Sequence, residues 1–167
     1  MKLSISSMPM FFEERHHALA ADLSRLAHLL EATPHDEKGA RDVAGALGET
    51  HGLYSLLIPE ALGGFPVGRP KDPTAVDVRA LCLVREMLGW ASPLADAIFA
   101  VQGLGSYPIV LAGSAAQKKE LLPEILSGAR IGAFALTEPE AGSDVAAMSC
   151  VARKSGDDFI LDGEKVF

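Results

Sequence analysis

The chain has 167 residues, of which 49% are hydrophobic and 22% are charged. This length suffices for one ordinary domain with a sizeable core, and the composition is typical of a soluble globular protein. The formal net charge of −7 argues against a nucleic-acid partner, because proteins that bind the phosphate backbone concentrate Lys and Arg.

The sequence predicts no metal site and no secretion. Cys82 and Cys150 lack Cys-x-x-Cys spacing, so we expect two buried thiols rather than a zinc site or a disulfide framework. Five histidines without metal-ligand spacing are expected to be solvated: His16, His17, His28, His35 and His51. The amino terminus has no apolar segment of a secretory signal, and we therefore expect a cytoplasmic protein.

Hydrophobic spacing predicts two helices near the amino terminus. One apolar stripe marks a helix from about Phe11 to Leu30 that Thr33-Pro34 ends. Its members are Phe12, Leu19, Leu23, Leu26 and Leu30. A second helix is expected from about Glu37 to His51, with Asp36 as its cap and Gly52 as its stop, and the two helices should pack together.

In the middle of the chain, the sequence predicts an irregular loop over residues 63–73 and further helices after it. Asp72-Pro73 is expected to start a helix that runs to about Trp90. Two short helices should follow, over 93–104 and 107–112. Three aromatic residues of this region are expected in the core: Trp90, Phe99 and Tyr107.

The apolar stretch from Trp90 to Gly113 is long enough to cross a bilayer. Proline and glycine interrupt it, and a helix in the centre of a bundle is equally apolar, so we expect buried helices and no membrane insertion. After it, Ser114 and Gln117 have the form of a capping box for a helix to about Leu126, closed by Gly128. Pro123 should kink or shorten that helix.

After Gly128 the pattern changes to short strands. We expect strands at 131–136, 148–153 and 158–161, and a tight turn at Asp162-Gly163 into a further strand. The predicted fold is thus mainly α: a helical domain over residues 1–129, followed at 130–167 by the first strands of an incomplete β-barrel domain. A few strands leave edges unpaired, so we expect a fragment or a chain that depends on a partner.

Between the first two predicted strands, the run from Ala133 to Asp144 turns from apolar to polar around Pro139 and Gly142. Such a loop presents amides and hydroxyls that suit an anionic group. Taken alone, the loop is better interpreted as a sheet connection in which Thr137 and Ser143 cap a turn and Glu138 and Asp144 are structural or solvated, with Asp144 capping the next turn.

Several runs in this order resemble the acyl-CoA dehydrogenase family. They are Leu57-Ile58-Pro59-Glu60 with Gly63-Gly64, Ala112-Gly113-Ser114, Gln117-Lys118 before Leu122-Pro123, Gly128, Thr137-Glu138-Pro139, Ala141-Gly142-Ser143-Asp144 and Asp162-Gly163-Glu164-Lys165. The resemblance implies FAD bound between the β-domain and the helical domains, and oxidation of an acyl-CoA thioester to the trans-2-enoyl-CoA. It also implies a homo-oligomer when complete, with an electron-transfer flavoprotein or a similar acceptor.

The resemblance also assigns residues to the cofactor. The implied FAD-binding positions are Phe134, Leu136, Thr137, Gly142, Ser143 and Phe167. Among them, Thr137 is expected near flavin N5, Ser143 near the pyrophosphate or the CoA arm and also at the substrate, and Phe167 where the family often has tryptophan.

No residue of the chain is predicted to be the catalytic base. The family's base is a carboxylate in a carboxy-terminal helical domain that this sequence lacks, so we expect no dehydrogenase turnover from the chain alone. Two alternatives remain open at this stage. One is a related flavin-dependent acyl-CoA oxidase or monooxygenase, and the other is a non-catalytic module that docks on a full-length relative.

Overall fold

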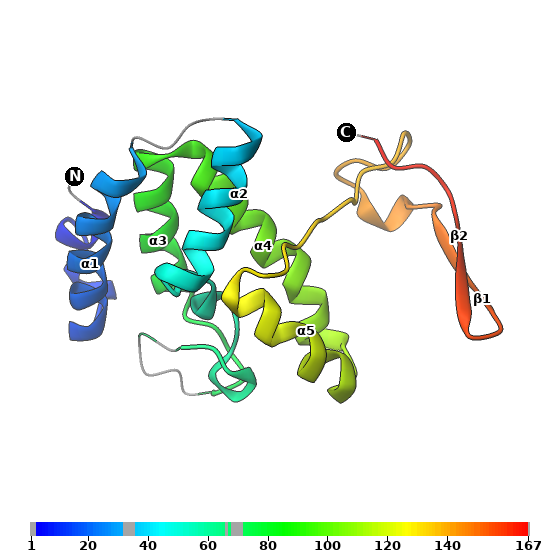
Figure 1. The fold of residues 1–167 in the computed structure, drawn as a ribbon, viewed down its shortest axis with the longest axis horizontal. Coiled ribbons are helices and arrows are strands. Elements are labelled where there is room, and N and C mark those ends of the chain that lie inside the picture. The colour runs from blue at the N-terminus through cyan, green and yellow to red at the C-terminus, as the bar shows by residue number, and fades with distance from the viewer. Residues whose placement is uncertain (1–2, 32–35, 66, 68–71, 167) are drawn as a thin grey trace. The chain divides into compact units, whose positions relative to one another are not determined.

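The structure is a computed structural model that describes residues 3–31, 36–65, 67 and 72–166. It divides into two compact units, Met1–Ala133 and Phe134–Phe167. The first unit is helical, and the second carries two strands (Figure 1). This agrees with the predicted fold class, a helical amino-terminal domain followed by the first strands of another.

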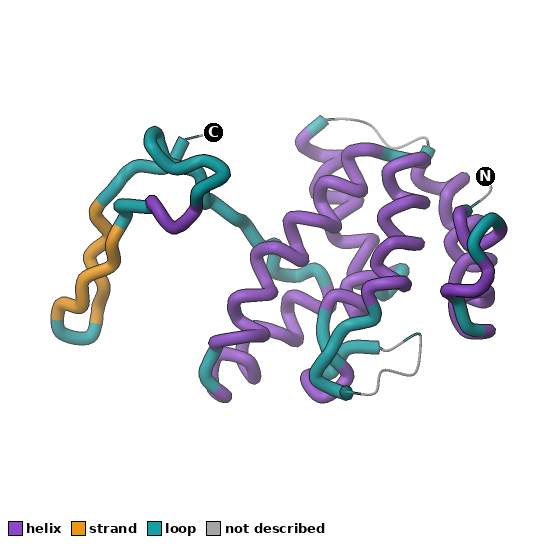
Figure 2. Tube along the Cα trace, turned by 180° about the vertical axis from the view of Figure 1, so that it is seen from behind, coloured by secondary structure: helices purple, strands orange, loops and turns teal. Residues whose placement is uncertain are grey.

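In the described part of the first unit there are five α-helices: α1 (Glu14–Leu30), α2 (Glu37–Gly45), α3 (Val78–Ala91), α4 (Pro93–Ala112) and α5 (Ala115–Ser127). A π-helical turn (Ala46–Thr50) extends α2, and a 3-10 segment (Leu53–Leu57) follows it. Helix α3 packs between α1 and α4, and α4 also packs on α2 and α5 (Figures 1 and 2).

The core lies where these helices meet. The stripe predicted for α1 is confirmed, because Leu23, Leu26 and Leu30 are all buried. Tyr54 and Phe99 stack in the centre with ring centroids 6.2 Å apart. The Tyr54 hydroxyl donates to the Ala44 carbonyl oxygen at 3.0 Å, and burial raises the pKa of this phenol.

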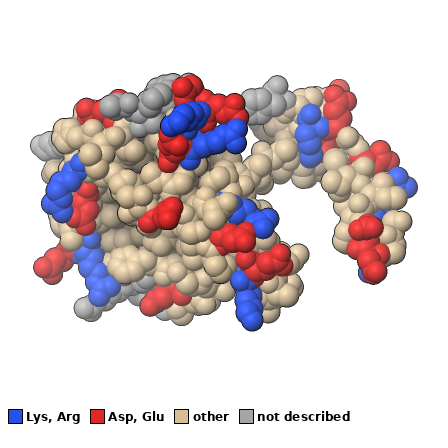
Figure 3. Space-filling view, viewed as in Figure 1, with Lys and Arg blue, Asp and Glu red and all other residues tan. Residues whose placement is uncertain are grey.

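Many ionic contacts of the helical unit lie on its outside, where Figure 3 shows acidic and basic side chains interspersed. Arg85 of α3 binds Asp96 of α4 through two parallel hydrogen bonds, Nε to Oδ1 at 2.8 Å and Nη2 to Oδ2 at 2.6 Å. This bidentate geometry joins two helices that are consecutive in the chain.

Two predicted helix boundaries are wrong. Asp72-Pro73 does not start a helix, because the Asp72 carboxylate accepts hydrogen bonds from the amide and hydroxyl of Thr74 and forms a local turn. Asp77 caps α3 instead, through the amide of Arg79 at 3.0 Å. The stretch predicted as two short helices is the single helix α4, which contains Pro108. The capping box of α5 at Ser114 and Gln117 is confirmed.

Several burial predictions are also wrong. Trp90 and Tyr107 are 55% and 45% exposed, whereas Phe99 is buried as expected. Cys82 is exposed and Cys150 is half-buried. The core face of α3 is occupied by Leu83, Val84, Met87 and Leu88. Trp90 comes two residues after Leu88, about 200° further round the helix, and therefore points away from that face.

His16 is fully buried rather than solvated. Its Nδ1 accepts a hydrogen bond from the Glu13 amide at 3.1 Å, and its Nε2 lies 2.8 Å from Asp77 Oδ2. Because Nδ1 accepts, the proton belongs on Nε2, which donates to the carboxylate. The histidine thus completes the cap of α1 and joins that helix to the start of α3.

By length and composition, α4 is the one helix among the described residues that is able to cross a membrane, with a mean hydropathy of 1.4. Its inner face carries Gln102 and Ser106 in addition to apolar residues. Both polar side chains are hydrogen-bonded within the helical unit. The prediction of buried helices in this stretch is nevertheless wrong for most of α4, because only 28% of its most apolar 18 residues are buried.

The second unit contains an antiparallel hairpin of β1 (Val151–Ser155) and β2 (Asp158–Asp162), in which Arg153 lies opposite Ile160. Gly156, with φ of +63°, opens its two-residue turn. The tight turn predicted at Asp162-Gly163 is therefore wrong. Residues 131–136 and 164–166 are not strands, and the strand expected at 148–153 starts at Val151. Phe167 lies outside the described residues.

Candidate functional site

The polar loop predicted from the sequence forms a compact bend at the start of the second unit. Glu138 and Ala141 pair as an isolated antiparallel bridge. The Glu138 amide donates to the Ala141 carbonyl oxygen at 3.0 Å, and the Ala141 amide donates back at 3.2 Å. Pro139 and Glu140 form the tip between them, because this reciprocal pairing closes a tight turn.

The Glu138 carboxylate is the anchor of this bend. Its side chain is 3% exposed. Oε2 accepts from the amide and hydroxyl of Ser149 at 2.6 and 2.9 Å, and Oε1 accepts from the Cys150 amide at 3.0 Å and from Lys165 Nζ at 2.8 Å. The hydrogen bond from Lys165, followed by that from the Ser149 amide, lowers the pKa of Glu138 to about 2. We call Glu138, Ser149, Cys150 and Lys165 the Glu138 anchor.

Lys165 joins the segment after β2 to the start of the loop. In addition to Glu138, its ammonium donates to the Leu136 carbonyl oxygen at 2.9 Å. The next residue continues the contact, because the Val166 amide donates to the Thr137 carbonyl oxygen at 3.0 Å. Two segments that are almost thirty residues apart in the sequence are thereby held side by side.

The second acidic residue of the loop also has a structural partner. Asp144 accepts at Oδ1 from the Ala146 amide at 3.2 Å and caps the short helical turn Val145–Ala147. The predicted capping role of Asp144 is confirmed. The structural role predicted for Glu138 is also confirmed, although this carboxylate is buried rather than solvated.

The two hydroxyl residues of the loop are arranged differently. Thr137 and Ser143 are both exposed, and their hydroxyls have no hydrogen-bond partner among residues 3–31, 36–65, 67 and 72–166. Phe134 is 44% exposed and Leu136 is half-buried. The loop thus uses its carboxylates internally, whereas its two hydroxyl residues are exposed.

Gly142 lies directly before Ser143 and is open to its surroundings. A Cβ at this position would meet no described atom within 4 Å. Its φ lies outside the left-handed region. The fold of the described chain therefore does not require glycine here, whereas the close approach of a ligand to the backbone would.

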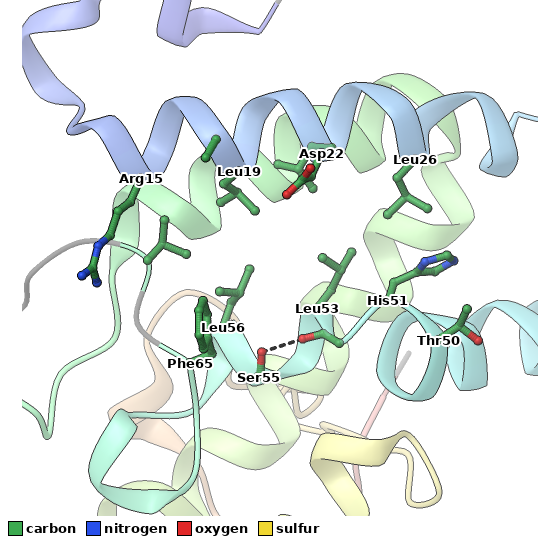
Figure 4. Close-up of a pocket in the computed structure, with 14 residues that line it drawn as sticks. Arg15, Leu19, Asp22, Leu26, Thr50, His51, Leu53, Ser55, Leu56 and Phe65 are labelled. Carbon is green, nitrogen blue, oxygen red and sulfur yellow. Dashed lines mark hydrogen bonds between the residues drawn. The ribbon is translucent and has the colours of Figure 1, made fainter.

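Among the described residues of the helical unit, two of the grooves contain no residue predicted for the site. The first has a volume of about 770 Å³ between α1 and the segment Leu53–Leu56 (Figure 4). Apolar side chains form most of its walls, with Arg15 near one end and His51 near the other. Burial lowers the pKa of the His51 imidazole. The second groove, of about 710 Å³, lies between α2 and α4.

Sequence reasoning missed the roles of Ser149 and Lys165. Lys165 was recognised only as a member of the run from Asp162, because spacing alone does not show that its ammonium reaches a carboxylate 27 residues away. No group of three potential metal ligands occurs in the part of the chain that the structure describes.

Comparison with known proteins identifies the class. Residues 13–129 match the sequence model of the acyl-CoA dehydrogenase N-terminal domain. The helical unit is thus a domain of this class, and the protein belongs to the acyl-CoA dehydrogenase family. A probable acyl-CoA dehydrogenase of Mycobacterium leprae is 34% identical over 157 residues, which are 91% of this chain and 38% of the relative. The chain therefore spans well under half the length of this relative.

Solved structures agree. The crystal structure of an acyl-CoA dehydrogenase from Bacillus anthracis complexed with FAD is similar with a TM-score of 0.71 and 28% identity, over 94% of this chain and 27% of that one. A glutaryl-coenzyme A dehydrogenase in complex with glutaryl-CoA gives a TM-score of 0.69 and 27% identity, over 92% and 39% of the two chains.

Proposed function

We propose that this chain is the amino-terminal part of an FAD-dependent oxidoreductase that oxidises an acyl-CoA thioester to the trans-2-enoyl-CoA. Its proposed domains are residues 1–129 and the opening of a β-domain at 130–167. The observation that carries the proposal is the difference between the acidic and the hydroxyl residues of the loop. Glu138 and Asp144 are bound within the chain, whereas Thr137 and Ser143 keep their hydroxyls exposed.

The residues of the loop fit a flavin dinucleotide. The FAD would supply the hydride acceptor when bound. Neutral hydroxyls suit it because they donate to a phosphate or to an electron-rich ring without the charge of a side chain. Thr137 would hold the ring near N5, and Ser143 would bind the pyrophosphate or the CoA arm and the substrate. Gly142 has no Cβ, so the backbone would lie close to phosphate oxygens.

Apolar residues complete the proposed cofactor site. Phe134 and Leu136 precede Thr137. The side chain of Phe134 is exposed, and that of Leu136 is half-buried. Phe167 would place an aromatic ring beside the flavin, and it follows Val166, whose amide binds the Thr137 carbonyl oxygen. This pairing supports a site to which both ends of the unit contribute.

Glu138 is not the base that removes the α-proton. A carboxylate with a pKa of about 2 is a poor proton acceptor near neutral pH, and four donor groups already occupy its oxygens. We therefore propose that the base lies in a carboxy-terminal helical domain. The 167-residue chain alone would not turn over acyl-CoA.

Partners and location follow from the same proposal. The substrate would be an acyl-CoA, and electrons would leave through an electron-transfer flavoprotein or a similar acceptor. The complete protein would be a cytoplasmic homo-oligomer. The similar structures support the substrate class, since one of them is a glutaryl-coenzyme A dehydrogenase bound to glutaryl-CoA.

The test uses the complete protein, purified with its flavin. We expect a yellow protein whose affinity for FAD falls at least about tenfold when Thr137→Val and Ser143→Ala are combined, as loss of a charge-assisted hydrogen bond implies. Thr50→Val, an exposed threonine of the helical unit, is the matched control and should bind FAD normally. A complete protein that is colourless and does not take up FAD would disprove the proposal.

A further inference from the structure

Gln102 is a buried polar residue that the proposed function does not use. Its side chain has 0% exposure in the middle of the apolar helix α4. Nε2 donates to the carbonyl oxygens of Ile125 and Arg130 at 3.1 and 3.0 Å, and Oε1 accepts from the Gly132 amide at 2.6 Å. One amide side chain thus satisfies three backbone groups, one at the end of α5 and two in the segment that leaves the helical unit.

Glycines on both sides of this contact allow the backbones to touch. A Cβ on Gly105 of α4 would lie 2.9 Å from the Cα of Gly132 and 3.0 Å from the amide nitrogen of Ala133. Gly128, with φ of +78°, ends α5. The segment 130–132 is therefore fixed to α4 by shape and by hydrogen bonds, although it has no regular secondary structure.

This contact ends just before the loop of the second unit. Thr137 follows Gly132 by five residues, and a fully extended chain of that length reaches at most about 17 Å. Phe134 follows it by two residues, a reach of about 7 Å. The hydrogen bonds of Gln102 therefore restrict the space that these two residues can sample, and restriction of a binding loop reduces the entropy lost when its ligand binds.

We propose that Gln102 is a positioning residue for the flavin-binding loop: its amide holds residues 130–132 on α4 and limits where Phe134 and Thr137 can lie. The proposal rests on the proposed function, because it concerns the same loop. Gln102 does not touch the cofactor in this role. It acts through the backbone of Arg130 and Gly132.

The first experiment replaces Gln102 by Leu in the complete, FAD-loaded protein. Leu keeps the volume but cannot bond to the three backbone groups. We expect faster hydrogen exchange at the Gly132 amide. We also expect a weaker affinity for FAD, lower by about tenfold for each residue that FAD binding must order again. The affinity is measured well below the melting temperature, where a loss of global stability alone would not change it.

Two further variants separate positioning from folding. Gln102→Glu retains an acceptor for the Gly132 amide but sets a buried carboxylate against the carbonyl oxygens of Ile125 and Arg130, so its FAD affinity should fall at least as far as that of Gln102→Leu. Gly105→Ala disturbs the same contact from the other side and should also weaken FAD binding. Gly45→Ala is the matched control, because a Cβ there meets nothing within 4 Å, and it should leave FAD binding unchanged.

The outcomes distinguish this inference from the proposed function. If the wild-type complete protein binds no FAD, the proposed function fails. If the wild type binds FAD and folded Gln102→Leu or Gly105→Ala binds it equally well, the positioning role is disproved and the proposed function stands. Should Gln102→Leu fail to fold, Gly105→Ala decides the question.

Discussion

The two units of this protein hold their shapes by different means. In the helical unit, apolar side chains from all five helices meet in a shared core, and Leu23, Leu47, Leu83, Met87 and Leu88 have exposures of 0 or 1%. In the second unit, every residue of β1 and β2 is exposed, and the buried residues among 134–166 are Glu138 and Ala141. Its shape depends on the Glu138 anchor and on one hairpin.

This difference shows that apolar burial stabilises the helical unit, whereas polar contacts hold the second unit. Burial of apolar area is the main source of stability for a helical bundle, whereas an isolated two-stranded hairpin is marginal in water. Phe159, Ile160 and Leu161 of β2 are 65%, 53% and 76% exposed. The proposed ligand residues therefore lie in the unit with the weaker local structure, and polar contacts fix the loop there.

The largest loss of stability is expected from a substitution in the core of the helical unit. Leu83→Ala removes a side chain with 0% exposure, and we expect the free energy of unfolding to fall by about 2–5 kcal/mol. Leu161→Ala, at a site that is 76% exposed, should change it by less than about 0.5 kcal/mol. Chemical denaturation of both variants measures the contrast, and equal effects would contradict it.

A pair of glycines gives the next effect. A Cβ on Gly64 would lie 1.6 Å from the Ile58 carbonyl oxygen, so Gly64→Ala should destabilise the helical unit by about 1–3 kcal/mol through a forced backbone shift. Gly142→Ala meets nothing within 4 Å. It should leave stability unchanged and weaken FAD binding to the complete protein. Calorimetry and FAD titration separate the two, and a destabilised Gly142→Ala protein would contradict this view of the loop.

A smaller effect comes from helix capping. Ser114 accepts from the Gln117 amide at 3.2 Å, and the Ser114 amide donates to Gln117 Oε1 at 2.8 Å. Ser114→Ala should lower the free energy of unfolding by about 1 kcal/mol. Ser143→Ala, which removes a hydroxyl without a partner among the described residues, should not change thermal stability. Thermal melting tests both, and a Ser114→Ala protein as stable as the wild type would show that the cap is unimportant.

The last effect is a local dependence on pH in the second unit. The pKa of Glu138 falls from 4.5 to about 2 in the folded chain. A lowered pKa in the folded state stabilises the fold fully at pH values above the unfolded value. The contribution of the Glu138 anchor should therefore be complete above about pH 4.5 and decline as the pH falls toward 2.

Hydrogen exchange at the Ser149 and Cys150 amides measures this decline, because both amides donate to Glu138. Protection should decrease across the range from pH 4.5 to 2 in the wild type. In Glu138→Gln it should be low and independent of pH. Amide protection in the wild type that stays constant down to pH 2 would argue against the anchor.

Much of the helical unit was predictable from the sequence because its signals are local. The stripe of α1, the cap at Asp36 and the capping box of α5 are confirmed. The errors occurred where two local signals compete. At Asp72-Pro73 the aspartate forms a turn with Thr74 instead of starting a helix. The break predicted between residues 104 and 107 does not occur, because α4 runs through it.

The candidate site was predicted less completely. The run from Thr137 to Asp144 was recognised by its residue types, and the capping role of Asp144 was expected. The ion pair of Glu138 with Lys165 and the three hydrogen bonds of Gln102 were not, because each joins residues 23 to 30 positions apart. Burial of His16 was missed for the same reason, since its partner Asp77 is 61 positions away.

The sequence by itself determined the family, the helical class and the residue types of the loop, since these depend on spacing and composition along the chain. Only the tertiary structure decided which polar groups of the loop are engaged and which are exposed. A side chain's hydrogen-bond partners depend on distance in space, and residues brought together by packing of the helices or by a hairpin leave no periodic signal in the sequence.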